Sequence, residues 1–129
     1  MTGTMLAVGV DIIEVVRIER SVEKLGQRFL DRIFTIQEQA YCEGRSERLA
    51  GRFAVKEAVG KALGIGIGDV RWQEIEVIND RRGRPELVLH GDAKELAEKL
   101  GLHSWSISMS HSETNAVGMA VALGGAVSG

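Results

Sequence analysis

The sequence lacks the features that mark a disulfide-stabilised, membrane-spanning or strongly basic protein. Its 129 residues include one cysteine, Cys42, which excludes a disulfide within the chain and fits a cytoplasmic protein in a reducing compartment. The net charge of -2 argues against a general nucleic-acid binder. The longest apolar stretch, residues 116–127, contains glycines and is short of the roughly 20 residues that a spanning helix needs. We therefore expect no membrane span and no nucleic-acid partner.

Several common functional motifs are also missing. The N-terminal residues lack a basic region, and Asp11 interrupts their apolar run, so a signal peptide is not expected. No Cys/His metal cluster and no G-x-S-x-G nucleophile motif occurs. The glycine-rich residues 65–69 have neither the Walker nor the dinucleotide spacing. With 44% hydrophobic and 26% charged residues, the chain has the composition of one globular domain over residues 1–129.

Hydrophobic periodicity and turn residues predict an alternation of strands and helices. Gly26 is expected to interrupt the first helix, Thr35 and Glu38 form a capping box, Ser46 and Asp92 are predicted N-caps, and Gly64 ends the central helix. The predicted strands are residues 5–10, 72–78, 86–90, 104–111 and 115–123, and the predicted helices are residues 14–29, 35–43, 46–64 and 93–100. This order favours an α+β fold with an antiparallel sheet and packed helices.

The last predicted strand has one face of small residues and one face of larger apolar residues. The small residues Gly118, Ala120 and Ala122 alternate with the larger apolar residues, which are Val117, Met119, Val121 and Leu123. The small face allows a helix or another subunit to approach closely. Because one domain cannot cover every apolar face of such strands, we expect a homo-oligomer.

The central helix carries the strongest chemical pattern. Phe53, Glu57 and Lys61 follow one another at intervals of four residues, so they lie in one row along the helix. The neighbours of Glu57 are small or apolar, which predicts a partly desolvated carboxylate. Such a group needs a cation, either Lys61 or a metal ion.

A second carboxylate makes a metal site conceivable. Asp11 follows the first predicted strand, and Asp11, Glu57 and Lys61 together suit Mg²⁺ and a phosphate, with His111 contacting phosphate or handling a proton. The simpler alternative is that Asp11 caps the following helix and that Glu57 and Lys61 form a surface ion pair. The residues alone leave both readings open.

The joint motifs resemble those of the 4′-phosphopantetheinyl transferases, in their short bacterial form. The resemblance rests on Gly9-Val10-Asp11, on Arg17 six residues later, and on residues 50–61, which include Arg52 and the Lys56-Glu57 pair. Further matching stretches are Gly64-Ile65-Gly66, the turn from Asn79 through Gly83-Arg84-Pro85, and Ser108-Met109-Ser110-His111.

The resemblance implies transfer of the 4′-phosphopantetheine arm from coenzyme A to a serine of apo-acyl carrier protein, releasing adenosine 3′,5′-bisphosphate, in fatty acid biosynthesis. It implies Mg²⁺ on Asp11 and Glu57. It implies coenzyme A contacts from the following residues: Arg52, Lys61, Gly64, Pro85 and His111. Glu57, or a water on the metal, is the preferred acceptor of the serine proton, ahead of His111.

The resemblance also implies partners. The family forms homotrimers with sites between subunits, and Arg17, Arg20 and Arg28 of the first helix would dock the acidic carrier protein. Two other classes of function stay open at this point. One is a non-catalytic module that binds coenzyme A or a nucleotide, and the other is an oligomeric interaction protein in which Glu57 and Lys61 are structural.

Overall fold

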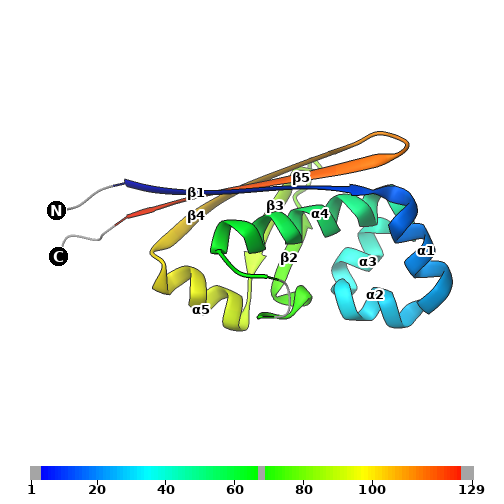
Figure 1. Ribbon diagram of the computed structural model, residues 1–129, viewed down its shortest axis with the longest axis horizontal. Coiled ribbons are helices and arrows are strands. Elements are labelled where there is room, and N and C mark those ends of the chain that lie inside the picture. The colour runs from blue at the N-terminus through cyan, green and yellow to red at the C-terminus, as the bar shows by residue number, and fades with distance from the viewer. Residues whose placement is uncertain (1–3, 67–68, 126–129) are drawn as a thin grey trace.

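A long central helix, α4, packs against one face of a three-stranded sheet, and the smaller elements surround the rest of the helix (Figure 1). The computed structural model describes residues 4–66 and 69–125, so the predicted loop at residues 65–69 lies partly outside it. The elements in chain order are β1 Thr4–Glu14, α1 Val15–Leu25, α2 Gln27–Ile33, α3 Ile36–Cys42, α4 Ser46–Leu63, β2 Ile75–Asn79, β3 Pro85–Leu89, α5 Gly91–Lys99, β4 Leu102–His111 and β5 Asn115–Gly125. The predicted α+β fold with antiparallel sheets is confirmed.

Strand β5 lies in the middle of the sheet, in the order β1-β5-β4, and pairs with both neighbours in antiparallel fashion. β1 is longer than the predicted residues 5–10, because it pairs with β5 from Thr4 to Glu14. Asp11 therefore lies within the strand, opposite Gly118, and not after its end.

The inner face of the sheet is built from small residues because α4 lies directly on it. A Cβ atom added at Gly118 would collide with the backbone of Ala54 and Val55, and one added at Gly9 would collide with the Ala58 carbonyl group. Ala120 and Ala122 are fully buried on the same face. The small face predicted for β5 thus receives the chain's own helix.

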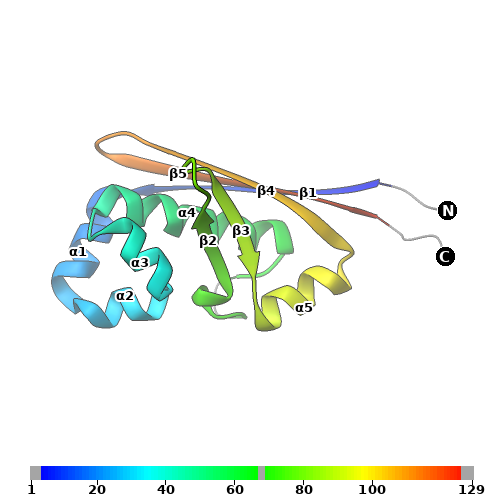
Figure 2. The same ribbon diagram turned by 180° about the vertical axis from the view of Figure 1, so that it is seen from behind.

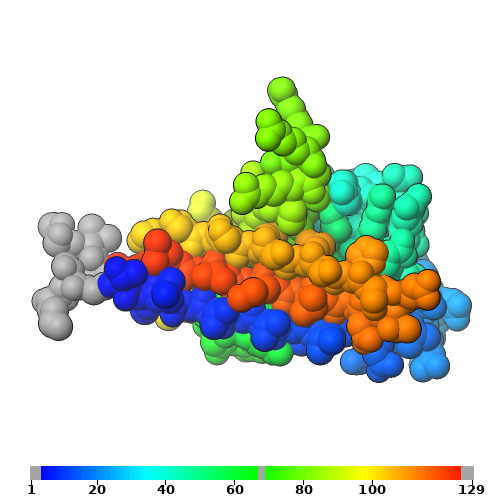
Figure 3. Space-filling model, turned by 90° about the horizontal axis from the view of Figure 1, so that it is seen from above, coloured from blue at the N-terminus to red at the C-terminus, as the bar shows by residue number. Residues whose placement is uncertain are grey.

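The outer face of the sheet is not covered by any described element (Figure 3). The exposed apolar side chains of β1 and β5 on it include Leu6, Val8, Val10, Ile12, Val117, Met119 and Leu123. Leu6 is 70% exposed and Ile12 is 66% exposed, which is unusual for large apolar residues. The exposed serines of β4 continue this face toward the sheet edge.

Helix ends follow the predictions at most positions. Gly26, with φ +60°, separates α1 from α2, and Gly64, with φ +76°, ends α4. The capping box is confirmed, since Thr35 Oγ1 accepts from the Glu38 N–H at 3.1 Å and Glu38 Oε1 accepts from the Thr35 N–H at 2.8 Å. The predicted cap of α4 is wrong by one position, because Arg45 is the N-cap and Ser46 is already helical.

The β2–β3 hairpin forms its own two-stranded sheet, between the α1–α3 group and α5 (Figure 2). Residues 72–74, predicted as strand, form a short 3₁₀ helix. The prediction of Asp92 as the N-cap of α5 is wrong, because α5 begins at Gly91 and His90 is its N-cap. Glu74 of the 3₁₀ helix accepts a hydrogen bond from the Ala93 N–H in the first turn of α5, through Oε1 at 3.2 Å. No helix in the described part of the chain is long and apolar enough to cross a membrane.

Candidate active site

The predicted carboxylates meet at the β1 edge of the sheet. Lys61 Nζ donates to the Val10 carbonyl at 2.9 Å and to Asp11 Oδ1 at 3.1 Å. Lys61 thus pairs with Asp11 from another element, and the alternative of an ordinary Glu57–Lys61 surface pair is wrong. The alternative role of Asp11 as a helix cap is wrong as well, because Glu14 is the N-cap of α1.

Glu57 is half-buried, as its apolar neighbours predicted. Burial and, next, the negative charge of Asp11 raise the pKa of the Glu57 carboxyl, while Lys61 and Arg17 oppose the rise. The two carboxylates are therefore close enough for the charge of Asp11 to disfavour the ionised form of Glu57. A further cation would relieve this repulsion.

The donor set fits a hard divalent cation. Among residues 4–66 and 69–125 there is no group of three or more His, Cys, Asp or Glu side chains that would hold a metal by themselves. Asp11 and Glu57 would therefore supply only two ligands. This matches Mg²⁺, which binds few protein carboxylates and keeps positions for water and phosphate oxygens.

A basic pocket lies at the β4 edge of the sheet, with a volume of about 560 Å³. Its lining includes Arg48, Arg52, Arg84, Pro85 and His111. Three of its lining residues are arginines, and Glu47 supplies the one lining carboxylate. The cationic lining suits a phosphorylated ligand.

Arg52 is held rigidly in the wall of this pocket. Its Nη2 donates to Asn79 Oδ1 at 2.6 Å, and its guanidinium lies over the Tyr41 ring, 4.4 Å from the centroid. Its Nε is buried and has no hydrogen-bond partner in the described part of the chain. A guanidinium group in the pocket wall places positive charge beside any anion that enters the pocket.

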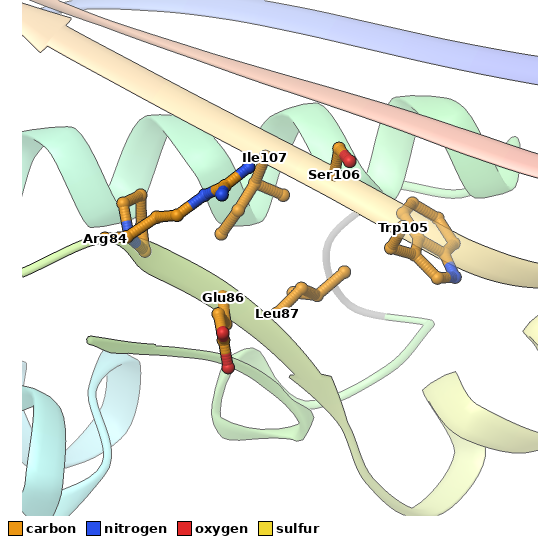
Figure 4. A pocket seen from close by; sticks show the side chains of 7 residues that line it. Arg84, Glu86, Leu87, Trp105, Ser106 and Ile107 are labelled. Atoms are coloured by element: carbon orange, nitrogen blue, oxygen red, sulfur yellow. The ribbon is translucent and has the colours of Figure 1, made fainter. Parts of the chain in front are cut away.

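A smaller cavity of about 330 Å³ lies beside the basic pocket, between β3 and β4. Figure 4 shows Arg84 extending from the start of β3 toward Ile107, while the carboxylate of Glu86 points away. Arg84, Pro85 and Ile107 line both cavities, so the two lie side by side at the turn end of the hairpin.

The predicted site residues thus fall into two groups at opposite edges of one sheet. The acidic half, defined as Asp11, Glu57 and Lys61, lies at β1, and the basic half, defined as Arg52, Pro85 and His111, lies at β4. Gly64 caps α4 away from the basic pocket, at the start of the loop that is only partly described. Of the predicted docking residues, Arg17 lies near Glu57, and Arg20 and Arg28 are exposed on α1 and α2.

The sequence interpretation gave no role to Lys56, which is completely buried. Its Nζ donates to Glu38 Oε1 at 2.8 Å, to the Trp72 carbonyl at 3.1 Å and to the Ile75 carbonyl at 2.5 Å. Burial lowers the pKa of the Lys56 ammonium, and the charge of Glu38 counteracts this. One feature of the sequence could have indicated a role for Lys56. Arg52 and Lys56 are four residues apart, which places both on a second face of α4.

Comparisons with known proteins agree with this architecture. Residues 7–121 match the model of the 4′-phosphopantetheinyl transferase superfamily. The chain is 45% identical over 127 residues to a holo-[acyl-carrier-protein] synthase of Herpetosiphon aurantiacus, covering 93% of this chain and 100% of that protein. A synthase of the same name from Moorella thermoacetica is 47% identical over 120 residues, covering 91% and 93%.

Solved structures give the same result. The holo-[acyl-carrier-protein] synthase of Helicobacter pylori, determined in complex with coenzyme A, matches with a TM-score of 0.82 and 32% identity, covering 89% of this chain and 98% of that chain. The chain therefore belongs to the 4′-phosphopantetheinyl transferase superfamily and, within it, to the holo-[acyl-carrier-protein] synthase family.

Proposed function

We propose that this protein transfers the 4′-phosphopantetheine group of coenzyme A to a serine of an apo-acyl carrier protein and releases adenosine 3′,5′-bisphosphate. The observation that carries the proposal is the pair of complementary half-sites, one dicarboxylate and one cationic, on a chain of this family. Relatives named for this synthesis, and a relative solved with coenzyme A, support the same reaction.

The basic half would bind the nucleotide end of coenzyme A. Arg52 in the pocket wall and His111 at the end of β4 would contact its phosphates, with Arg52 at the 3′-phosphate. Pro85 would shape the wall of this pocket, and Gly64 would let the donor approach the end of α4. Lys61 would contact the pyrophosphate from the acidic half.

Asp11 and Glu57 would hold Mg²⁺. When bound, Mg²⁺ would supply positive charge to the pyrophosphate of the donor. The serine Oγ bonds to the phosphorus that carries the pantetheine, and the bond from that phosphorus to the bridging oxygen breaks. Lys61 neutralises the charge on the departing phosphate, and Glu57 takes the serine proton.

We infer that the two halves meet between copies of the chain. They lie at opposite edges of one sheet, and the uncovered outer face offers an apolar surface for association. The family resemblance supplies the number three, so we propose a homotrimer, acting in the cytoplasm in fatty acid biosynthesis. Arg17, Arg20 and Arg28 would dock the carrier protein beside the acidic half.

The decisive experiment is a transfer assay. Purified protein, coenzyme A, Mg²⁺ and an apo-carrier protein are mixed, and the mass of the carrier is followed. The expected result is a mass gain of one phosphopantetheine group, lost with Glu57→Gln but kept with the exposed control Glu95→Gln. Coenzyme A binding without any mass gain would favour a non-catalytic binding module and refute the transferase.

Complementation between inactive variants tests the shared site. Glu57→Gln removes the acidic half and His111→Ala removes the basic half, while each leaves the other half intact. A mixture that exchanges subunits should regain activity, because some interfaces then pair two intact halves. Persistent inactivity of a mixture that forms mixed oligomers would contradict the placement of the site between subunits.

The oligomer itself is tested by sedimentation. Leu6→Glu places a charge on the outer sheet face and should dissociate the assembly, whereas Leu100→Glu, at the end of α5, should not. An unchanged sedimentation coefficient for Leu6→Glu would rule out the outer face as the interface.

A further inference from the structure

The turn of the β2–β3 hairpin concentrates positive charge. Arg81, Arg82 and Arg84 are exposed, and the salt bridges of the described residues involve other cations. The one acidic residue of the turn, Asp80, uses its Oδ1 to accept the backbone N–H groups of Arg82 and Arg84, at 2.8 and 2.9 Å. The guanidinium groups are therefore left to interact with something outside this chain.

The turn is rigid, which favours a binding role. The Asp80 N–H donates to the Arg84 carbonyl and the Gly83 N–H donates to the Asp80 carbonyl, both at 2.9 Å. Asn79 Nδ2 donates to the Gly83 carbonyl at 2.9 Å, and its Oδ1 accepts from Arg52. The backbone that carries the arginines is thus fixed before a partner arrives, which reduces the entropy cost of binding.

The hairpin stands out from the body of the molecule (Figure 3) beside the basic half. Arg84, the last residue of the turn, lines both cavities, whereas Arg81 and Arg82 line neither. At roughly 3.3 Å per residue, Arg81 and Arg82 lie within about 10 Å of Arg84 along the chain. Gly83 and Arg84 line the basic pocket and Arg81 and Arg82 do not, so the two arginines lie at the rim of this pocket, where a protein that covered its mouth would meet them.

We propose that Arg81 and Arg82, named here the arginine tip, bind an acidic patch on the protein that accepts the transferred group. This inference rests on the proposed function and adds a second contact surface to the one proposed on α1 and α2. The whole chain carries a net charge of -2, so the positive charge of the arginine tip is local. Its electric field would attract an acidic partner and orient it. Arg81 and Arg82 are exposed and line neither cavity, which favours a protein surface over the small donor.

The test compares the double variant Arg81→Glu/Arg82→Glu with a matched control. Lys94→Glu/Lys99→Glu makes the same change of charge on the exposed surface of α5. The KM values for an apo-carrier protein and for coenzyme A are measured at low and high salt. The arginine tip variant should raise the KM for the carrier about tenfold at low salt, less at high salt, and leave kcat and the KM for coenzyme A unchanged.

The other outcomes overturn the inference. An unchanged carrier KM, or an equal rise in the α5 control, shows that the arginine tip does not contact the carrier. A rise in the KM for coenzyme A, alone or with the carrier KM, assigns the arginines to the donor instead. A wild-type protein that transfers nothing would refute the proposed function, and an active wild type with an unaffected variant would refute the arginine tip alone.

Discussion

Replacing Lys56 by methionine tests the buried ion pair at the centre of α4. Lys56 and Glu38 are both completely shielded from solvent, and Nζ has three acceptors around it. Methionine has nearly the same length, so the substitution removes the charge and three donated hydrogen bonds while it creates little empty volume. Glu38 keeps the N–H groups of Thr35 and Val77 but loses its cation.

The expected cost is large because only one partner is removed. Leaving a buried carboxylate without its cation costs about 3–5 kcal/mol, far more than the net contribution of the intact pair. A domain of this size unfolds with about 5–15 kcal/mol, so Lys56→Met should lose between about a fifth and all of its stability. This corresponds to a fall in Tm of roughly 10–20 °C.

Urea unfolding followed by circular dichroism measures this loss, with Lys61→Met as the control. The control makes the same change in the same helix, but the Lys61 side chain is 54% exposed and that of Asp11 is 22% exposed, so water reaches both partners of this pair. Exposed pairs contribute about 0–1 kcal/mol, so the control should stay close to wild type. Equal losses in the two variants, or a loss below about 1 kcal/mol for Lys56→Met, would refute the reasoning.

Three further results are expected. The pKa of Glu57 is raised by burial and by Asp11, so its carboxyl favours the folded state when protonated, and this contribution is lost as the pH rises through the raised pKa. Glu57→Gln should therefore be more stable than wild type at pH 7 in metal-free buffer, an advantage that vanishes below the unfolded pKa of about 4.3; equal unfolding curves at pH 7 would contradict it. Gly118→Ala should destabilise by at least about 1–3 kcal/mol in urea, because its Cβ would meet the backbone of α4; a neutral effect would show that the helix can move away. Burial raises the pKa of Cys42 to about 11, so a thiol reagent should label it only after unfolding, and rapid native labelling would contradict its burial.

Local patterns predicted most of the fold, because the local rules and the tertiary structure agree there. The alternation in residues 104–111 and 115–123 predicted β4 and β5 closely, and the Thr35 capping box and Gly64 fixed the ends of two helices. β1 was predicted too short because its pairing with β5 continues through Asp11 to Glu14, and a distant partner leaves no local signal. For the same reason Glu74, from another element, replaced Asp92 at the start of α5.

The candidate site was predictable where its residues share a helix row and unpredictable where they meet across the fold. The spacing of Glu57 and Lys61 indicated one face of α4, yet the partner of Lys61 is Asp11, which lies 50 residues away in the sequence. Lys56 and Glu38 are 18 residues apart and lie in different helices, so helical periodicity could not predict their contact either. Such pairs depend on how α4 packs against the three-stranded sheet on one side and against α3 and β2 on the other.

The geometry of α4 explains why residues 52–61, which are continuous in the sequence, contribute to two separate half-sites. Arg52 and Lys56 lie on one face of the helix and contact β2, through Asn79 and the Ile75 carbonyl. Glu57 and Lys61 lie on another face and meet Asp11 of β1. A straight helix cannot bring these faces together, and β5 separates β1 from β4 within the sheet. If the two halves act on one donor, as we propose, a second copy must bring the basic half to the acidic half, and the outer sheet face is the apolar surface that such a copy would cover.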